Sequence, residues 1–188
     1  MVTARNGAGR HKGCSVSGIA AKRLVFAMLD TDGDGVISRD DYFSRIDRVT
    51  AATGRGEDDP MVVRARAAGE QAWAAMDADG DGRMTEAEYL EWVGVDAFDN
   101  ICSPALGALF DLADTDKDGT LDRRAFVLLR TALNNPAGNA EAAFDALDTD
   151  GDGRVSRQEY LMSIRTHISG EHSPAGEVLY SGNALETS

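Results

Sequence analysis

Apolar side chains recur along the chain in four similar blocks, each made of a helical stripe, a short polar stretch and a second helical stripe. Before each polar stretch an aromatic residue stands three positions ahead of a smaller apolar residue, so both fall on one face of a helix. After it, an apolar residue is followed five positions later by an aromatic one. The pattern predicts four helix–loop–helix units and an all-α chain, with these aromatic pairs: Phe26 and Tyr42, Trp73 and Tyr89, Phe110 and Phe126, Phe144 and Tyr160.

Capping residues mark where the second helix of each unit begins. The side-chain oxygens of Ser, Thr and Asp accept hydrogen bonds from the free N–H groups of a first helical turn. An acid three residues later completes a reciprocal capping box in three units, at Asp41, Glu88 and Glu159. We therefore expect the second helices to begin directly after the capping residues Ser38, Thr85, Asp122 and Ser156.

The composition indicates a folded, acidic protein. Hydrophobic residues make up 43% of 188 residues, which is enough for a core, and 32 acids outweigh 19 bases to give a net charge of -13. An acidic chain lacks the basic face that nucleic acids and anionic membranes require, so we expect neither as a partner. No apolar run approaches the roughly 18 residues of a membrane span. The excess of Arg over Lys, 16 to 3, hints at a GC-rich bacterial genome.

The acids are concentrated in the polar stretches between the stripes. Each stretch carries aspartates at its first, third and fifth positions and a glycine at its sixth. Three like charges within five residues repel one another unless a counter-ion lies among them. We number these twelve-residue stretches loop one (Asp30–Asp41), loop two (Asp77–Glu88), loop three (Asp114–Ala125) and loop four (Asp148–Glu159).

Calcium is the counter-ion that this pattern fits. It takes six to eight oxygens. In the EF-hand calcium-binding proteins, which these loops resemble, side chains at positions 1, 3, 5 and 12 and the backbone carbonyl at position 7 supply them. The glycine at position 6 permits the sharp turn. The predicted ligands are Asp30, Asp32, Asp34, Val36 and Asp41 in loop one; Asp77, Asp79, Asp81, Arg83 and Glu88 in loop two; and Asp148, Asp150, Asp152, Arg154 and Glu159 in loop four.

These loops and their flanking helices resemble the EF-hand calcium-binding proteins. The family's loop pattern, D-x-[DN]-x-[DN]-G-x5-E, is met in full in loops two and four. In arrangement the chain resembles the calerythrin and sarcoplasmic calcium-binding protein group, which also has four hands. The resemblance implies two pairs of hands in one compact globule. It further implies short paired β segments between the loops, with Ile37 opposite Met84 and Leu121 opposite Val155.

The four loops are not equivalent. Loop one ends in Asp41, whose shorter side chain makes two-oxygen closure harder, so we expect weaker calcium preference and tolerance of Mg²⁺ there. Loop three ends in Ala125, which offers no side-chain oxygen, although Asp122 at position 9 could compensate in part. We therefore expect three calcium sites and a weak or empty site in loop three, formed by Asp114, Asp116, Asp118 and Thr120.

The breaker-rich segments between the units predict the organisation of the chain. Asp59 and Pro60 are expected to cap and begin the first helix of the second hand. The segment from Val178 to Tyr180 is apolar and is expected to return to the core. The predicted parts are a disordered arm (1–16), hands one and two (17–94), a linker (95–102), hands three and four (103–168) and a tail packed on the core (169–188).

Three functions compete at this stage. A calcium buffer or transporter binds ions and changes shape little, whereas a sensor exposes an apolar groove to a partner protein. A calcium-stabilised enzyme is the third alternative, but the hands and linkers use almost all residues, so we expect no enzymatic activity. We favour the buffer, with the sensor as the alternative, because a docked tail would fill the groove.

The remaining expectations concern assembly and location. We expect a monomer whose partners are calcium ions, with a protein target only if it is a sensor. Two cysteines do not make a disulfide framework, and the basic residues before position 17 are not followed by the apolar run of a secretory signal. The predicted location is therefore the cytoplasm.

Overall fold

The structure is a computed structural model that describes residues 16–181. Residues 1–15 of the predicted arm and residues 182–188 of the predicted tail lie outside the described part. Its elements are α1 (Val16–Leu29), β1 (Val36–Ser38), α2 (Arg39–Ala52), α3 (Pro60–Met76), β2 (Arg83–Thr85), α4 (Glu86–Trp92), α5 (Val95–Ala97), the π-helical turn η1 (Phe98–Cys102), α6 (Ser103–Ala113), β3 (Thr120–Asp122), α7 (Arg123–Ala132), α8 (Ala137–Leu147), β4 (Arg154–Ser156), α9 (Arg157–Ser169) and α10 (Pro174–Ser181).

The helices begin where the capping residues predict. The N-caps of α2, α4, α7 and α9 are Ser38, Thr85, Asp122 and Ser156, respectively. Each cap side chain accepts a hydrogen bond from the backbone N–H of the residue three positions later. The reciprocal capping box is present in α2, α4 and α9. Asp59 caps α3, with Pro60 in its first turn. The capping residues therefore determine where the second helix of each unit begins.

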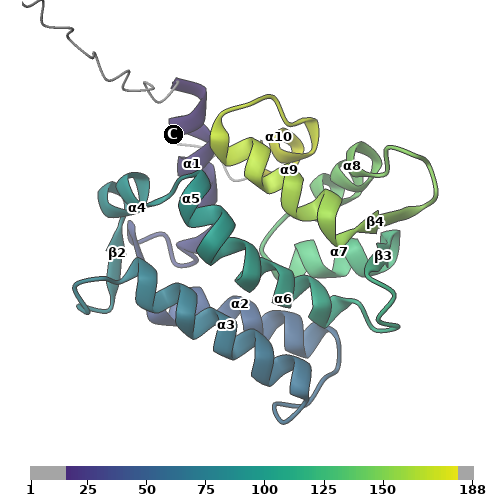
Figure 1. The fold of residues 1–188 in the computed structure, drawn as a ribbon, viewed down its shortest axis with the longest axis horizontal. Coiled ribbons are helices and arrows are strands. Elements are labelled where there is room, and N and C mark those ends of the chain that lie inside the picture. Colours follow the sequence, from purple (N-terminus) through teal and green to yellow (C-terminus); the bar gives the residue numbers. More distant parts are fainter. Residues whose placement is uncertain (1–15, 182–188) are drawn as a thin grey trace, which may run out of the picture.

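The four helix–loop–helix units form two pairs. The strand β1 pairs antiparallel with β2, with Ile37 opposite Met84, and β3 pairs antiparallel with β4, with Leu121 opposite Val155. This confirms the predicted register. Both two-stranded ribbons lie at an edge of the molecule, with helices on their inner side (Figure 1).

Aromatic side chains cross within each pair. The aromatic ring before the loop of one hand packs on the aromatic ring after the loop of the other hand. Each hand therefore needs its partner to bury its aromatic side chains. Ring centroids lie 5.6 Å apart for Phe26 and Tyr89, 5.5 Å for Tyr42 and Trp73, 5.5 Å for Phe110 and Tyr160, and 5.7 Å for Phe126 and Phe144.

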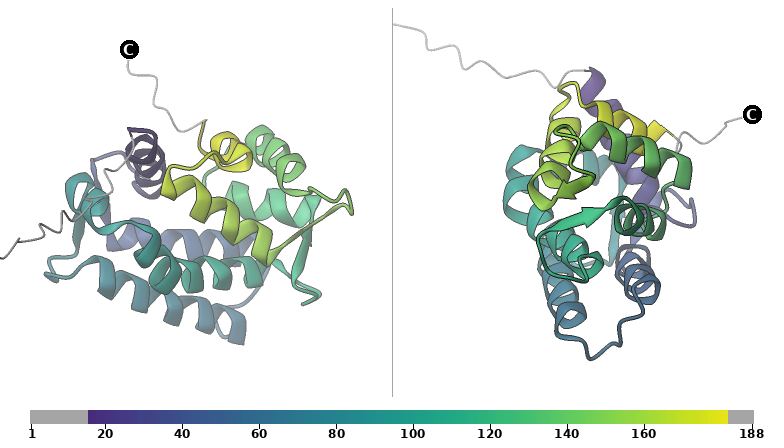
Figure 2. Two further views of the ribbon diagram at one scale, coloured as in Figure 1. Left: turned by 45° about the horizontal axis from the view of Figure 1, so that its top comes forward. Right: turned by 90° about the vertical axis from the view of Figure 1, so that its right-hand side faces the viewer.

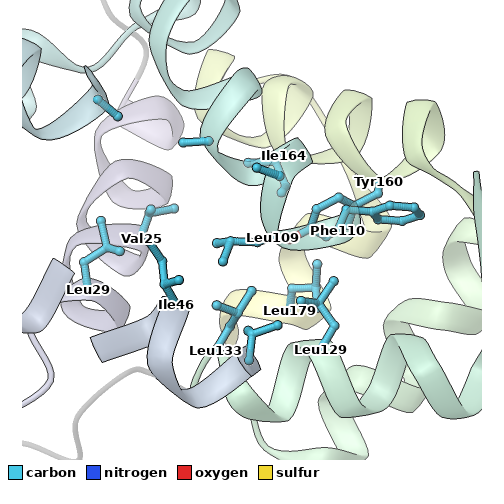
Figure 3. Close-up of a cluster of buried hydrophobic side chains, with 14 of the residues drawn as sticks. Val25, Leu29, Ile46, Leu109, Phe110, Leu129, Leu133, Tyr160, Ile164 and Leu179 are labelled. Carbon is cyan, nitrogen blue, oxygen red and sulfur yellow. The ribbon is translucent and has the colours of Figure 1, made fainter. Parts of the chain in front are cut away.

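The two pairs close on each other around one core. Helices α2 and α3 run side by side along one edge, α6 packs on α3, and α8, α9 and α10 form the opposite side (Figures 1 and 2). Val25 and Leu29 of α1 and Ile46 of α2 face Leu133 and Ile164 from the second pair across the interior (Figure 3). The hands therefore form one compact globule, as the fold class predicts.

The linker predicted at residues 95–102 is itself helical. Together, α5, η1 and α6 make an uninterrupted helical run from Val95 to Ala113. Pro104 has no N–H to give to Asn100, and the wider π-type turn η1 lies directly before it. The two pairs are thus joined by helix rather than by a flexible loop. Within residues 16–181, no helix is long and apolar enough to cross a membrane.

Candidate metal centres

The four acidic loops share one backbone shape. In each, the carboxylates at positions 1, 3 and 5 have oxygens within 4.8 Å of one another. The sixth-position glycine is left-handed in every loop, with φ of 85° at Gly35, 78° at Gly82, 84° at Gly119 and 78° at Gly153. A side chain would be strained at this φ, which is why glycine is needed. The sequence therefore brings three carboxylates together in all four loops.

Two backbone hydrogen bonds hold each ring of carboxylates in place. The N–H of the sixth-position glycine donates to one oxygen of the first aspartate, as in Gly82 to Asp77 Oδ2 at 3.1 Å and Gly153 to Asp148 Oδ2 at 3.1 Å. The N–H at position 7 donates to the fifth-position carboxylate, as in Arg83 to Asp81 Oδ1 at 2.8 Å. These bonds fix the orientation of the carboxylates at positions 1 and 5 in each loop.

The first aspartate provides the clearest test of whether a cation fits. In loops two, three and four its second oxygen is buried and has no hydrogen-bond partner: Asp77 Oδ1, Asp114 Oδ1 and Asp148 Oδ1. A buried oxygen of a carboxylate without a donor is costly unless a cation satisfies it. In loop one the equivalent oxygen, Asp30 Oδ1, instead accepts the N–H of Gly33 at 2.9 Å. Carboxylate, carbonyl and hydroxyl oxygens are the ligands of a hard cation such as calcium.

The twelfth-position carboxylates differ between the loops. Glu88 and Glu159 each use one oxygen, Oε2, to accept the backbone N–H and hydroxyl of the capping residue. Hydrogen bonds from the Thr85 hydroxyl and N–H keep the pKa of Glu88 below its usual value. The other oxygen, Oε1, takes part in no hydrogen bond in either side chain within the described part of the chain. Each glutamate thus retains an acceptor for an ion.

Asp41 in loop one uses both of its oxygens within the protein. Oδ2 accepts from the Ser38 N–H and hydroxyl, and Oδ1 accepts from the Thr31 N–H at 3.2 Å and from the Thr31 hydroxyl. Burial raises the pKa of Asp41, but the hydrogen bonds from Ser38 and Thr31 outweigh burial and leave the pKa lowered. To bind a cation, Asp41 must give up donors that Glu88 and Glu159 do not have. The second-position Thr31 is a partner that sequence reasoning missed.

Loop three departs furthest from the others. Ala125 leaves the twelfth position without an oxygen, and Lys117 holds a left-handed φ of 61° at the position where the other three loops have glycine. Asp122, which could have compensated, uses its carboxylate to cap the Ala125 N–H at 2.8 Å. The ring of Asp114, Asp116 and Asp118 is nevertheless formed.

An arginine from loop four reaches into loop three. The side chain of Arg154 crosses the β3–β4 ribbon and donates from Nη1 to Asp118 Oδ2 at 2.5 Å and to Thr120 Oγ1 at 2.8 Å. Hydrogen bonds from Thr120 first, and then the Arg154 charge, lower the pKa of Asp118. The first pair repeats the arrangement loosely, with Arg83 Nη2 at 3.9 Å from Asp34 Oδ2. The sequence predicted only the carbonyls of these two arginines as functional, and nothing in the loop motif points to their side chains.

Comparisons with known proteins agree with this geometry. The sequence profile of the family described as "EF-hand domain pair" matches residues 20–94 and 104–173. No curated protein matches the chain significantly. A calcium-binding protein of Streptomyces coelicolor, whose structure is described as the basis of prokaryotic calcium-mediated regulation, is similar with a TM-score of 0.70 and 27% identity over 82% of this chain and 99% of its own.

Two eukaryotic structures share the fold at lower identity. The Ca²⁺-regulated photoprotein mitrocomin of the jellyfish Mitrocoma cellularia has a TM-score of 0.70 at 19% identity, over 96% of this chain and 98% of its own. The coelenterazine-binding protein of Renilla muelleri has a TM-score of 0.64 at 19% identity, over 87% of this chain and 94% of its own. At these identities the likeness concerns the arrangement of the helices.

Proposed function

The chain belongs to the EF-hand domain pair family and is a calcium-binding protein of the EF-hand type, and from that premise we propose that it acts as a calcium buffer. The observation that carries the proposal is the docked tail, α10. Leu179 and Tyr180 are 0% and 1% exposed, the Leu179 carbonyl accepts from Asn135 Nδ2 at 2.6 Å, and the helix packs on α8, α9 and α1. A buffer binds ions without opening a surface, and this tail covers the place where a sensor would receive a partner helix.

Calcium would be held in loops two and four, and less tightly in loop one. Loops two and four combine an unsatisfied first-position oxygen with a free oxygen on Glu88 or Glu159, so a cation gains two ligands at no loss of protein hydrogen bonds. In loop one the corresponding carboxylates, Asp30 and Asp41, already accept hydrogen bonds from the protein. This favours Mg²⁺, which keeps several of its waters and needs fewer protein ligands than calcium does. We infer that loop three stays weak because Arg154 supplies a positive charge to Asp118 there.

The sensor is the second candidate, and one observation favours it. The similar protein from Streptomyces coelicolor is described in terms of calcium-mediated regulation, and it is similar to this chain over 99% of its own length. Against a sensor, the large apolar side chains that are exposed within residues 16–181 are Ile19, Val63 and Met162, which come from different helices. A groove for a partner would need α10 to leave.

Dye binding separates the two proposals. Nile red is neutral and brightens on apolar surface, so calcium-saturated full-length protein should bind it no better than chelated protein if α10 stays docked. Deleting residues 176–188 should create calcium-dependent Nile red fluorescence, because the surface under Leu179 and Tyr180 is uncovered.

The matched control is a deletion of residues 182–188 only, which leaves α10 intact. It should behave as the full chain does. Strong calcium-induced Nile red fluorescence in the full chain would overturn the buffer proposal in favour of the sensor.

A further inference from the structure

A largely apolar cavity lies between the two pairs of hands and reaches loop one at Thr31 and Asp41. Its volume is about 60 Å³, and it is lined by side chains from α1, α2, α3, α4, η1, α6, α7, α9 and α10. Most of the lining is apolar or aromatic. At about 10–15 Å³ for each water molecule, the space holds several waters or a small chain of carbon atoms.

Three arginines also line this cavity: Arg45 and Arg48 of α2, and Arg130 of α7. Arg130 is 0% exposed and Arg45 is 8% exposed. Among the residues that the structure describes, none of the three has a carboxylate within 4.0 Å, although the protein carries a net charge of -13. Positive charge is thus gathered inside a protein whose excess charge is negative.

The neutral contacts of these arginines leave donors free. Arg130 donates from Nη1 to Tyr160 Oη at 2.9 Å, and Arg45 lies over the Tyr42 ring at 3.8 Å, but Nε of both side chains is buried without a partner. Arg48 is better satisfied, by the Ala132 carbonyl at 2.7 Å and the Ser44 hydroxyl at 2.8 Å. A buried guanidinium without a counter-charge is costly, because desolvation is not repaid.

No lining acid repays that cost. Among the described residues, the only acid in the lining is Asp41, and both of its oxygens already accept hydrogen bonds from Thr31 and Ser38. The lining thiol does not help either, because burial raises the pKa of Cys102 to about 11 and keeps it neutral. Three cations against one engaged carboxylate leave the cavity with a net positive charge.

We propose that this cavity binds a small amphipathic carboxylate, with its anionic head on Arg130 and Arg45 and its hydrocarbon body against the apolar lining. Guanidinium groups present paired N–H donors that match a carboxylate, and the apolar walls reward a chain of carbon atoms rather than a bare ion. The site borders loop one at Thr31 and Asp41. The proposal does not depend on whether the protein is a buffer or a sensor.

Octanoate is a suitable probe, with octanol and acetate as comparisons. Isothermal titration of the calcium-saturated full chain should show octanoate binding at one site, with a change in Trp92 fluorescence because that indole lines the cavity. Octanol, which lacks the charge, and acetate, which lacks the chain, should each bind at least about 10-fold more weakly.

Two variants and one control test whether Arg130 and Arg45 bind the carboxylate of octanoate. Arg130→Met and Arg45→Met, on different helices, should each lower octanoate affinity by about 10- to 100-fold while changing octanol affinity less than about twofold. Arg124→Met removes the same charge from an exposed position on α7 and should bind octanoate as the unaltered chain does.

The outcomes are distinct. No octanoate binding to the unaltered chain overturns the proposal, as does octanol binding that equals octanoate binding, which would make the cavity merely apolar. Acetate binding that equals octanoate binding would make it a bare anion site and would also overturn the proposal. Two arginine variants are tested so that one result remains if the other variant fails to fold. In a folded variant, loss of the preference for octanoate over octanol supports the assignment, and retention of that preference contradicts it.

Discussion

Arg154 contributes to two loops with different parts of the same residue. Its carbonyl is a predicted ligand at position 7 of loop four, while its guanidinium binds Asp118 and Thr120 of loop three. Both groups of the pair are exposed, so the contact in itself adds little stability. It places a positive charge beside Asp118, one of the three aspartates of the loop three ring. Loop three therefore has two obstacles, the missing oxygen at Ala125 and the charge of Arg154.

The two obstacles can be removed one at a time. Ala125→Glu should give loop three a twelfth-position carboxylate and add a weak fourth calcium, and Ala125→Glu with Arg154→Ala should strengthen that site further by about 10-fold or more, since one opposing charge is gone. Calorimetric stoichiometry and affinity measure both effects.

Arg124→Ala in the Ala125→Glu background is the control, because it removes a charge that contacts neither carboxylate ring. A fourth site already as tight as the others with Ala125→Glu alone would show that Arg154 does not oppose the ion. Loop four should keep its calcium in every variant, because Arg154→Ala retains the backbone carbonyl.

At the scale of single elements, α10 is held by close packing on α9. A Cβ at Gly176 would lie 2.7 Å from Cβ of His167, so glycine permits the approach. The His167 ring stacks on Tyr180 with centroids 4.8 Å apart and an interplanar angle of 18°. Nε2 of His167 is buried without a hydrogen-bond partner. Burial lowers the pKa of His167, and the nearby Glu177 only partly opposes this.

Acid should therefore loosen the tail. The folded chain resists protonation of His167, whereas the unfolded chain accepts a proton near the ordinary pKa of 6.5. The unfolded state thus binds more protons as the pH falls below about 6.5, so this residue's contribution to stability is complete above that pH and is lost below it. In saturating calcium, the melting temperature should fall more steeply from pH 7.5 to 5.5 in the unaltered chain than in His167→Phe, which keeps the stacked ring.

His172→Gln serves as the control for that pH series. His172 is exposed, with Nδ1 2.9 Å from Glu177 Oε1, so its replacement shows whether the pH slope depends on the buried His167 or on any histidine near α10. Equal slopes for the unaltered chain and His167→Phe would contradict the account given for His167.

At the scale of the whole molecule, ion binding and folding are linked. Four rings of aspartate concentrate negative charge in a chain with a net charge of -13, and three of the rings hold a buried oxygen that no protein donor satisfies. An ion that binds only the folded state stabilises it by about 4 kcal/mol when its free concentration is 1,000 times the dissociation constant. The crossed aromatic pairs join the two hands of each pair, since each hand buries its aromatic side chains against its neighbour.

Removing calcium should therefore lower the melting temperature strongly. Scanning calorimetry with chelator and with excess calcium should show a rise on calcium addition, and Glu159→Gln should remove much of that rise, because loop four loses its closing carboxylate. Glu91→Gln, at an exposed position outside the loops, should leave the rise intact. A melting curve that chelator does not alter would contradict the linkage.

The sequence by itself determined the fold class and the positions of the rings. Three local signals were sufficient: the 3.6-residue spacing of apolar side chains, the four capping residues and the four glycines at position 6. Each of them depends only on residues that are close together in the sequence. The register of Ile37 with Met84 followed from the paired arrangement of the hands that the family resemblance implies. The missing oxygen at Ala125 was equally visible.

Only the tertiary structure decided what lies opposite each charged side chain. The contact of Arg154 with Asp118 joins two different loops, and the donors that Thr31 gives to Asp41 join opposite ends of one loop. The cavity brings together Arg45 and Arg130 from two different helices. The sequence did indicate that Arg130 is buried, since it lies on the same helical face as Phe126 and Leu129. It did not indicate which side chains of other helices face Arg130. Local periodicity specifies which face is buried, whereas charge balance depends on through-space neighbours, which only the packed chain brings together.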